Sequence, residues 1–553
     1  MTEQPKSNLL EPYITNLNDQ VFSIVDLNGI VGAVMARYSR AETGMRETLL
    51  REFIAEDKLK WDKAEKLIER VLIAFGDDSV GELEGAHLAF EEISMLATKV
   101  IEHRRIGGSP IEKSTRYVRF DQRDKNGCYL YVIPPGIQGE LKDEYTRSMD
   151  FIFKSYTTMW QPVHAYLKTI KPMEEAVYQL GGEDLRFRDC QTAKRQKQFE
   201  RTYRNDLKTK TCDVLRAFLP LACKANVGLF GNGRFYQHLI SKMLSSPLAE
   251  AQMLGEKAFV ELSKVIPHYV KRAAVSKYAQ TNHLNMLKLV RELFGATKNE
   301  DQRSFVSIEP DYQKIAARIA DESGPDTLRE SMLLDEEIQF LAALCYPYTN
   351  LSFDEIRKSL YEMDPNQRQS CYQAFYGHRK TRRDRPERSI EYGYPHHFEM
   401  VTEWAVYKDL MRHRMGTALI QPLEPHLGFE MPAECALAGV KDLALEIVTR
   451  AESLYQLIKQ ESSIDCEYAF LHGHRMRWLL GMNDRALMHM LELRTTPQGH
   501  PNYRKVSQHI HRALAEKFPE RSARMNFVNH QPVFWSRADS EARQRDKEDK
   551  IEE

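Results

Sequence analysis

Two stretches of this sequence repeat one pattern, and they decide how the chain is organised. Residues 79–104 read SVGELEGAHLAFEEISMLATKVIEHR, and residues 389–414 read SIEYGYPHHFEMVTEWAVYKDLMRHR. They align without a gap at an offset of 310 residues, which places Ser79 with Ser389 and His103 with His413. A constant offset over so long a stretch indicates an internal repeat rather than two unrelated helices.

Shorter matches extend the repeat in the same order along the chain. They pair residues 33–39 with 343–349, 231–235 with 482–486, and 262–267 with 514–519. Several weak matches in one order favour a duplicated domain. The sequence therefore predicts an N-terminal polar segment at 1–20, a first copy at 21–295, a linker at 296–310, a second copy at 311–535, and a charged, disordered tail at 536–553.

Composition excludes several classes of protein. Lys and Arg total 78 against 79 Asp and Glu, so the formal charge of −1 argues against coating nucleic acid or an anionic membrane. Hydrophobic residues make up 42% and charged residues 28%, as in ordinary globular domains. There is no apolar run of membrane-spanning length and no secretory signal, so we expect a soluble, cytoplasmic protein. The eight Cys residues form no CxxC pair, and we predict buried Cys side chains and no metal site.

The periodicity of apolar residues predicts mainly helices with a modest sheet. Helices are expected at residues 95–101, 249–265 and 400–414, where apolar residues recur every three or four positions. Strands are expected at residues 21–26, 129–133 and 303–308, which are rich in β-branched or aromatic residues. The predicted class is α+β.

Polar motifs follow the repeated helices. The first copy has Ser109-Pro-Ile-Glu112-Lys-Ser114-Thr-Arg116-Tyr117, and later Arg216-Ala-Phe-Leu-Pro220. The second copy has Arg412-His413-Arg414, and later Asn483-Asp-Arg485-Ala-Leu-Met-His489, followed by Arg494.

In these motifs the chain resembles the flavin-dependent thymidylate synthases, or thymidylate synthase complementing proteins. Their signature is R-H-R followed by S-x-N-E-x-S-x-R, then N-x-R-S-L-x-H and a final Arg. The resemblance implies two tandem copies of that fold, each helix-rich with a small, mostly antiparallel sheet.

Each copy keeps what the other has lost. In the first copy the triplet becomes Glu102-His103-Arg104, or alternatively Arg104-Arg105-Ile106, and Met243 takes the place of the final Arg. In the second copy Glu424 and Glu467 stand where the loop Arg and the later Arg belong.

The resemblance implies reductive methylation of dUMP to dTMP, with FAD as cofactor and NADPH and methylenetetrahydrofolate as co-substrates. Arg494 would stabilise charge on the pyrimidine, which makes it the expected catalytic residue. Substrate would be bound by Glu112, Ser114, Arg116 and Arg216, since a guanidinium pairs with phosphate through two parallel bonds. The residues expected to bind FAD are Ser79, His103, Arg104, Ser389, Arg412, His413, Arg414, Asn483, Arg485 and His489.

The family forms homotetramers with active sites between subunits. By resemblance, a fused pair would build a composite site from both copies, and two chains would form a homodimer that mimics the tetramer. We expect no membrane or nucleic-acid partner.

Simpler interpretations remain open for each motif. Arg412-His413-Arg414 can be a basic helix end, favoured by the helix dipole, and Asn483 can be an ordinary N-cap. The basic runs at 194–210 and 378–383 can be solvated helix faces. Two alternative functions also remain, namely a related flavoenzyme for another pyrimidine or nucleic-acid substrate, and a non-catalytic binding protein.

Overall fold

The computed structural model describes most of the chain. The described residues are 9–15, 17, 31–38, 45–55, 58–59, 82–103, 106–295, 305–309, 334–335, 338–339, 341–377, 389, 392, 396–517, 522, 525 and 527–535. The predicted strand at 21–26, Ser79, Arg104, the basic run at 378–383, the tail at 536–553 and most of the linker lie outside them.

The chain forms two compact units that cut across the predicted copies. Unit 1 contains Met1–Ile93, Ala97–Lys113 and Ala225–Lys277, and unit 2 contains Ser94–Leu96, Ser114–Lys224 and Tyr278–Glu553. Residues 114–224 of the first copy therefore belong to the same unit as the second copy.

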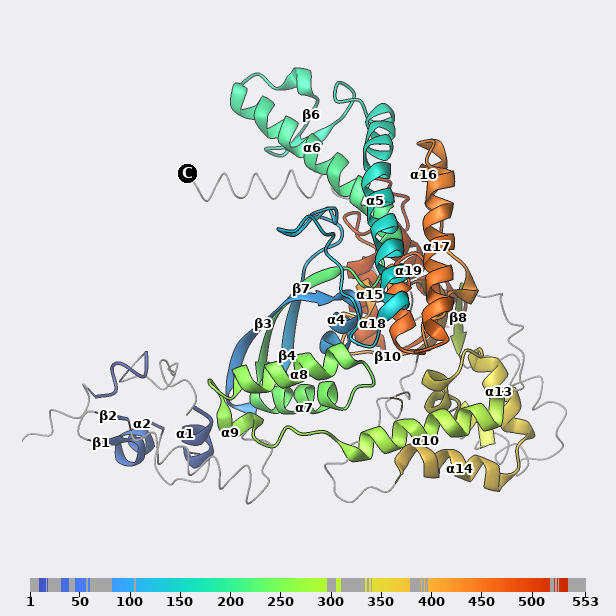
Figure 1. Cartoon of the computed structure of the whole chain (residues 1–553). Coiled ribbons are helices and arrows are strands. Elements are labelled where there is room, and N and C mark those ends of the chain that lie inside the picture. Colours follow the sequence, from blue (N-terminus) through green and yellow to red (C-terminus); the bar gives the residue numbers. More distant parts are fainter. Residues whose placement is uncertain are drawn as a thin grey trace, which may run out of the picture. The chain divides into compact units, whose positions relative to one another are not determined.

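Unit 1 is built on a three-stranded sheet with the order β3 (Gly85–Ser94), β7 (Lys224–Asn232), β4 (Gly108–Glu112). Helix α7 (Gly233–Leu244) begins directly after β7, and the side chain of Asn232 caps it by accepting from the backbone N–H of Phe235. The hydroxyl of Tyr236 on α7 donates to two strand carbonyls, so α7 packs on the sheet, as Figure 1 shows.

Further elements of unit 1 are α4 (Met95–Glu102), α8 (Ala249–Leu262) and α9 (Pro267–Val270). Its N-terminal part contains α1 (Val31–Tyr38), α2 (Met45–Thr48), a π-helix at Leu49–Phe53, β1 (Ile54–Ala55) and β2 (Lys58–Leu59).

Unit 2 is built on a four-stranded antiparallel sheet with the order β10 (Thr417–Ile420), β11 (Arg475–Met482), β9 (His396–Glu403), β8 (Val306–Glu309). Strands β9 and β11 are buried on both faces along almost their whole length. Helix α18 (Asp484–Arg494) follows β11 directly, and the side chain of Asn483 caps it by accepting from the N–H of Ala486.

Unit 2 also contains the long helices α5 (Gly139–Ile170), α6 (Ala193–Leu215), α17 (Lys441–Lys459) and α19 (Pro501–Lys517), and the short helices α15 (Trp404–Leu410) and α16 (Ala433–Leu437). Helices α5 and α17 lie side by side, and α6 packs on α5 (Figure 1). The short hairpin β5 (Tyr178–Leu180) and β6 (Glu183–Leu185) precedes α6. A helical layer of α10 (Lys277–Phe294), α13 (Phe353–Glu362) and α14 (Pro365–Tyr376) shares an apolar cluster with the sheet residues Leu419 and Leu479.

The two sheets repeat one topology, which confirms the duplication. The order β3-β7-β4 matches β9-β11-β10, and each central strand ends at an Asn that caps the next helix. Asn232 and Asn483 set an offset of 251 residues for this part of the repeat. The predicted class, α+β with small antiparallel sheets, is also confirmed.

Within unit 2, equivalent segments of the two copies pair with each other symmetrically. Pro220 forms an antiparallel bridge with Leu471, its own equivalent at an offset of 251. The N–H of Leu221 donates to the carbonyl of Phe470 at 2.9 Å, and the equivalent N–H of His472 donates to the carbonyl of Leu219 at 3.0 Å. This reciprocal pattern is that of an isologous two-fold interface, here formed inside one chain.

The predicted secondary structure is partly correct. The helices at 95–101 and 249–265 are confirmed as α4 and α8, and the strand at 303–308 corresponds to β8. The helix predicted at 400–414 is wrong at both ends, because its first residues complete β9 before α15 begins at Trp404, and α15 ends at Leu410, so that residues 411–414 form a turn. The strand predicted at 129–133 is wrong, because this segment forms only isolated bridges at Tyr129 and Tyr131.

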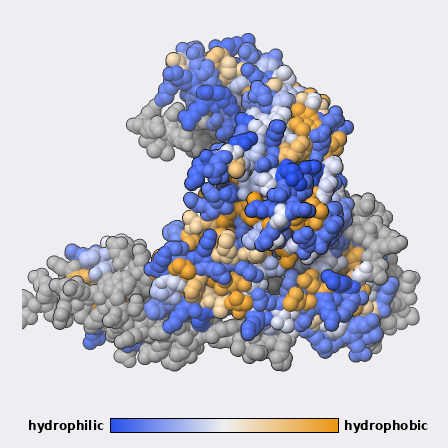
Figure 2. Space-filling model, in the orientation of Figure 1, coloured by the Kyte–Doolittle hydropathy of each residue, from blue (hydrophilic) through white to orange (hydrophobic). Residues whose placement is uncertain are grey.

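Seven of the eight Cys residues are buried, as expected, and Cys128 is exposed. Among the described residues, no helix has both the length and the apolar character needed to cross a membrane. Figure 2 shows a predominantly hydrophilic surface over α6, where Arg201, Arg204 and Lys208 are exposed, which supports a solvated face for that basic run.

Candidate functional site

A cluster of arginines from both copies lies in unit 2. Arg116 is held by the turn that follows β4, where its backbone N–H donates to Oγ of Ser114. Its Nε and Nη2 each donate to a carboxylate oxygen of Asp213 on α6 at 2.7 Å, and both side chains are buried. Burial alone would raise the pKa of Asp213, but Arg116 and His500 outweigh it and hold that pKa at about 2. The guanidinium fork of Arg116 is therefore already filled by a carboxylate.

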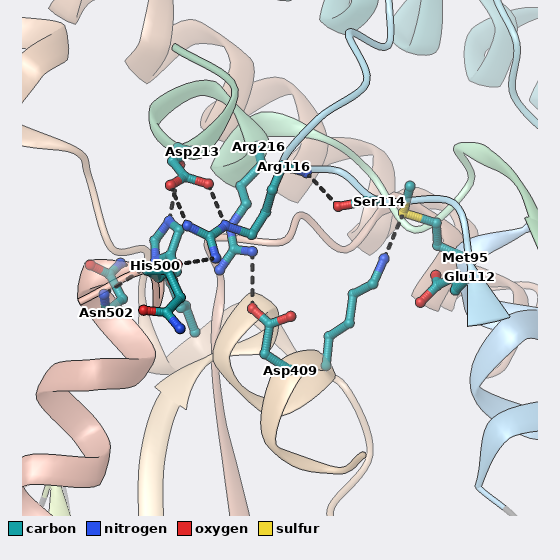
Figure 3. Close-up of polar contacts among 12 residues, drawn as sticks. Met95, Glu112, Ser114, Arg116, Asp213, Arg216, Asp409, His500 and Asn502 are labelled. Carbon is teal, nitrogen blue, oxygen red and sulfur yellow. Dashed lines mark hydrogen bonds and ion pairs between the residues drawn. The ribbon is translucent and has the colours of Figure 1, made fainter. Parts of the chain in front are cut away.

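Arg216 differs from Arg116, because part of its fork has no hydrogen-bond partner in the described part of the chain. It opens the 3-10 helix Arg216–Phe218, which follows α6, and its residue exposure is only 2%. Its Nη1 donates to Oδ2 of Asp409 on α15 at 3.0 Å (Figure 3). Its Nε and Nη2 are buried and have no hydrogen-bond partner among the described residues. Such donors are costly to leave unpaired, so they are suited to donate to an anionic or carbonyl oxygen of a ligand.

Asp409 is the electrostatic centre of the cluster. Burial alone would raise its pKa, but four guanidiniums outweigh burial and lower it well below the usual range. They are Arg216, Arg412, Arg116 and Arg494, in order of effect. The first copy contributes two of these cations and the second copy contributes the other two.

Arg494, the last residue of α18, is held by the triplet Arg412-His413-Arg414 of the second copy. Its Nε donates to Nε2 of His413 at 2.7 Å. Burial, Arg494 and His489 together lower the pKa of His413 to about 3. The imidazole is therefore neutral near pH 7, and since Nε2 accepts from Arg494, its proton resides on Nδ1.

Tyr503 on α19 connects the contributions of the two copies. The guanidinium carbon of Arg116 lies 5.9 Å from the centroid of the Tyr503 ring, and that of Arg494 lies 5.4 Å from the same centroid. Both distances are within cation–π range. The structure thus brings the predicted Arg116 and Arg494 to one aromatic ring.

A buried polar chain supports the cluster from α19. Nε2 of His500 lies 3.3 Å from the carbonyl oxygen of Asp213, and Nδ1 of His500 accepts from the N–H of Asn502. The amide of Asn502 donates to Glu403 at 2.8 Å. Burial raises the pKa of Glu403 to about 7, although Arg216 and Asn502 oppose the shift.

Sequence reasoning missed Asp213, Asp409, His500 and Tyr503. Asp409 stands in a helix whose residues are all buried, and an acid in such a position signals a charged partner. Asp213 is likewise an acid among buried residues near the end of α6. Nothing in the sequence around His500 or Tyr503 marks these two residues in a similar way.

The structure places the other predicted residues of the second copy around this cluster or in structural roles. The His489 ring lies 5.8 Å from the His413 ring, Arg412 is exposed, and Arg414 is partly buried. Ser389 is buried, and its carbonyl accepts from the N–H of Tyr392. The Asn483 side chain serves as a helix cap, as the simpler interpretation held. The side chain of Arg485 lies outside the described part.

The remaining residues of the first copy belong to unit 1. Glu112 is buried and accepts from Thr98 at 3.3 Å and from Lys99 at 3.5 Å. The carbonyl of His103 accepts from the ammonium of Lys242 at 3.4 Å. These contacts stabilise the unit, and whether Glu112 and His103 bind ligands stays a prediction.

The backbone hydrogen bonds shift the alignment of the first copy's triplet with Arg412-His413-Arg414 by one residue. The N–H of Met95 donates to the carbonyl of Cys223, and the N–H of Trp404 donates to the carbonyl of His474, which is the equivalent of Cys223. Met95 and Trp404 are therefore equivalent, which puts His103 at the position of Arg412. Glu92 in β3 has a φ of 56°, and Glu91 and Glu92 are both exposed, so the alternation of the strand is broken just before this point, where the extra residue fits.

Known proteins resemble this chain over almost its whole length. The sequence model of the family described as thymidylate synthase complementing protein matches residues 28–268 and 328–520, one region in each copy. A UPF0159 protein of Chlamydia muridarum (strain MoPn / Nigg) is 32% identical over 550 residues, which cover 97% of each chain. A UPF0159 protein of Chlamydia pneumoniae is 32% identical over 552 residues, covering 97% of this chain and 96% of the relative. A UPF0159 protein of Thermoplasma acidophilum is 27% identical over 508 residues, covering 90% of this chain and 95% of the relative.

Proposed function

The chain belongs to the thymidylate synthase complementing protein family, and we propose that it is a flavin-dependent thymidylate synthase with a composite site. Its reaction would be the reductive methylation of dUMP to dTMP, with methylenetetrahydrofolate as carbon donor and NADPH as reductant. The observation that carries this proposal is the convergence of Arg116, Arg216 and Arg494, from two copies, around Asp409 and Tyr503.

Arg216 is the best candidate for the nucleotide phosphate. Its two unpartnered donors are buried, and a phosphate oxygen would satisfy them through charge-assisted bonds. Arg116 was also expected to bind phosphate, but its fork is occupied by Asp213. We assign Arg116 to holding Asp213 and to adding positive charge.

Arg494 is the best candidate for the pyrimidine. A guanidinium at this position favours the ionised form of the ring, because it lies beside the charge that develops. The neutral His413 fixes the Nε end of Arg494 without adding a competing charge, which leaves the other two guanidinium nitrogens for substrate.

The residues near the end of α15 and the start of α18 fit an FAD. Arg412 is exposed and Arg414 is partly buried, and both carry the positive charge that a pyrophosphate pairs with. The N-terminus of α18, at Asn483, adds backbone N–H groups that favour anions. When bound there, FAD supplies the redox chemistry of the reaction. This chain's residues bind the cofactor and orient the nucleotide.

The assembly follows from the duplication. One chain already contains two copies joined by the reciprocal pairing at Pro220 and Leu471, so we propose a homodimer with four copies in total. Light scattering would measure the molecular mass of the purified protein and so test whether it is a homodimer.

The test of the proposed activity is direct. The purified protein is incubated with FAD, NADPH, methylenetetrahydrofolate and dUMP, and dTMP is measured by mass spectrometry. We expect dTMP from the parent chain and none from the Arg494→Ala variant. Bound flavin without dTMP would favour a related flavoenzyme with another pyrimidine substrate. A protein that binds neither flavin nor dUMP would contradict the proposal and favour a non-catalytic role.

A further inference from the structure

The duplication provides a second position equivalent to the arginine cluster. Ser109 pairs with Phe230, which lies two residues before the cap Asn232, and Thr417 pairs with Gly481, which lies two residues before the cap Asn483. Ser109 and Thr417 are therefore structural equivalents.

Counting from these anchors fixes the equivalents of both substrate arginines. Arg116 lies seven residues after Ser109, and Glu424 lies seven residues after Thr417. Arg216 lies sixteen residues before the cap of its copy, and Glu467 lies sixteen residues before the cap of the other. Arg216 and Glu467 also lie in equivalent 3-10 helices, Arg216–Phe218 and Asp465–Ala469. Both arginines of one position are thus replaced by glutamates at the other.

The two acids are close in space and satisfied by the protein itself. Glu424 pairs with the ammonium of Lys459 at 2.7 Å and lies 3.7 Å from His426. The Glu467 carboxylate accepts from the N–H of Leu423 at 3.2 Å, which ties it to the loop that carries Glu424. Burial, and then the Glu424 charge, raise the pKa of Glu467 to about 7, whereas the bond from Leu423 opposes the shift.

The third cation is missing as well. Met243 is the equivalent of Arg494 at the offset of 251, and its exposed fraction is 0%. It packs inside unit 1, where a Cβ placed on Gly255 would lie 2.9 Å from its Cβ. A guanidinium does not fit such a core position without a partner.

We propose that each chain binds one nucleotide monophosphate, at Arg216, and that the equivalent position at Glu467 is closed to anions. This inference rests on the proposed function for the identity of the nucleotide. Two features exclude a second phosphate, namely glutamates in place of both substrate arginines, with the Glu424 carboxylate already paired with Lys459, and the bond from Leu423 that holds Glu467 in the loop. The duplicated chain is thereby asymmetric, with one binding position and one structural position.

The experiment compares substitutions at equivalent positions in the intact, FAD-loaded protein. Isothermal titration calorimetry with dUMP, repeated with inorganic phosphate as the probe, gives the number of sites per chain and their affinity. The variants are Arg216→Gln and, as its matched control, Glu467→Gln. Arg216→Lys is added because it keeps a charge beside Asp409 if Arg216→Gln does not fold.

We expect one site per chain for the parent and for Glu467→Gln with unchanged affinity. Affinity should fall by about tenfold or more in Arg216→Lys, because a planar fork is lost. Two sites per chain, or one site that Glu467→Gln removes, would overturn the inference. One phosphate site at Arg216 without dUMP binding would uphold it and refute the proposed substrate. Absence of any site for either probe would overturn both proposals.

Discussion

Arg494 and His413 are joined by a 2.7 Å hydrogen bond in which the guanidinium Nε donates to the imidazole Nε2. They come from opposite ends of the repeated motif, and both are absent from the equivalent positions of the first copy. There Met243 replaces Arg494, and Arg104 stands in place of His413 once the alignment is shifted by one residue. Arg494 and the His413 side chain that holds it are therefore both present in the second copy and both absent from the first.

The first prediction concerns this support. His413→Leu should lower kcat/KM for dUMP by roughly 10- to 100-fold, because a hydrogen bond to a charged group contributes about 1.5–3 kcal/mol. His413→Gln is the matched control, since its side-chain oxygen can still accept from Arg494. We expect Gln to restore part of the activity at similar thermal stability. Equal activity of the Leu variant and the parent would contradict the role.

The second prediction concerns the buried pair of Arg116 and Asp213. Arg116→Ala leaves the Asp213 carboxylate uncompensated, which should cost about 3–5 kcal/mol in free energy of unfolding. Urea unfolding measures this cost. The folded pKa of about 2 lies below the unfolded value of about 3.9, so the pair's stabilisation is present above pH 4 and lost as pH falls towards 2. Asp213→Asn should lack that acid-side loss, and an unchanged acid profile would refute the assignment.

The third prediction concerns Glu403, whose contribution to the free energy of unfolding should change with pH in the direction opposite to that of Asp213. The folded pKa of Glu403, about 7, lies above the unfolded value of about 4.3, so its contribution to stability is full below pH 4 and is lost as pH rises to 7. The groups that act on it are Arg216, Asn502, Glu430 and Asp409. Glu403→Gln should make the unfolding free energy less dependent on pH between 4 and 7. A profile as steep as that of the parent would show that Glu403 is not responsible.

The fourth prediction separates a site within one chain from a site shared by two chains. Arg116 and Arg494 approach the same Tyr503 ring within one chain. Mixing Arg116→Ala chains with Arg494→Ala chains should therefore restore no activity. The double variant should be little worse than either single variant, because residues that act as a unit are non-additive. Recovery of dTMP formation in the mixture would place the site between chains.

The fifth prediction tests Tyr503 itself. Tyr503→Leu removes a ring that faces two guanidiniums, and each cation–π contact contributes about 0.5–2 kcal/mol. We expect weaker dUMP binding in Tyr503→Leu and near-parent binding in Tyr503→Phe, both measured by calorimetry. Similar loss in the two variants would assign the effect to the hydroxyl group instead.

The sequence allowed the repeat and most of the cations to be predicted, because each leaves a local mark. A long stretch at one offset is visible without a structure, although the folded chain shortens that offset by one residue from Met95 onward, and Arg412 to Arg414 is a contiguous motif. The core strands were missed for a physical reason. Strand β9 is buried on both faces, so it lacks the alternation that distinguishes a strand from a helix.

The carboxylates of the site were not predictable in the same way. Asp213 and Arg116 are 97 residues apart, and Arg216 and Asp409 are 193 apart. Only the folded chain shows that such distant charges are partners. For the same reason the sequence favoured Arg116 for phosphate, whereas the structure shows that Asp213 already fills its fork.

The reciprocal pairing of residues 217–222 with 468–473 has a consequence for how this protein can change over evolutionary time. In a symmetric oligomer encoded by one unduplicated gene, every substitution appears at all sites at once, so an Arg→Glu change that abolishes one site abolishes all of them. Once both halves are encoded in tandem, selection can act on each half separately. The glutamates at 424 and 467 are changes of the kind that such a linked arrangement tolerates, because Arg116 and Arg216 remain in the other half.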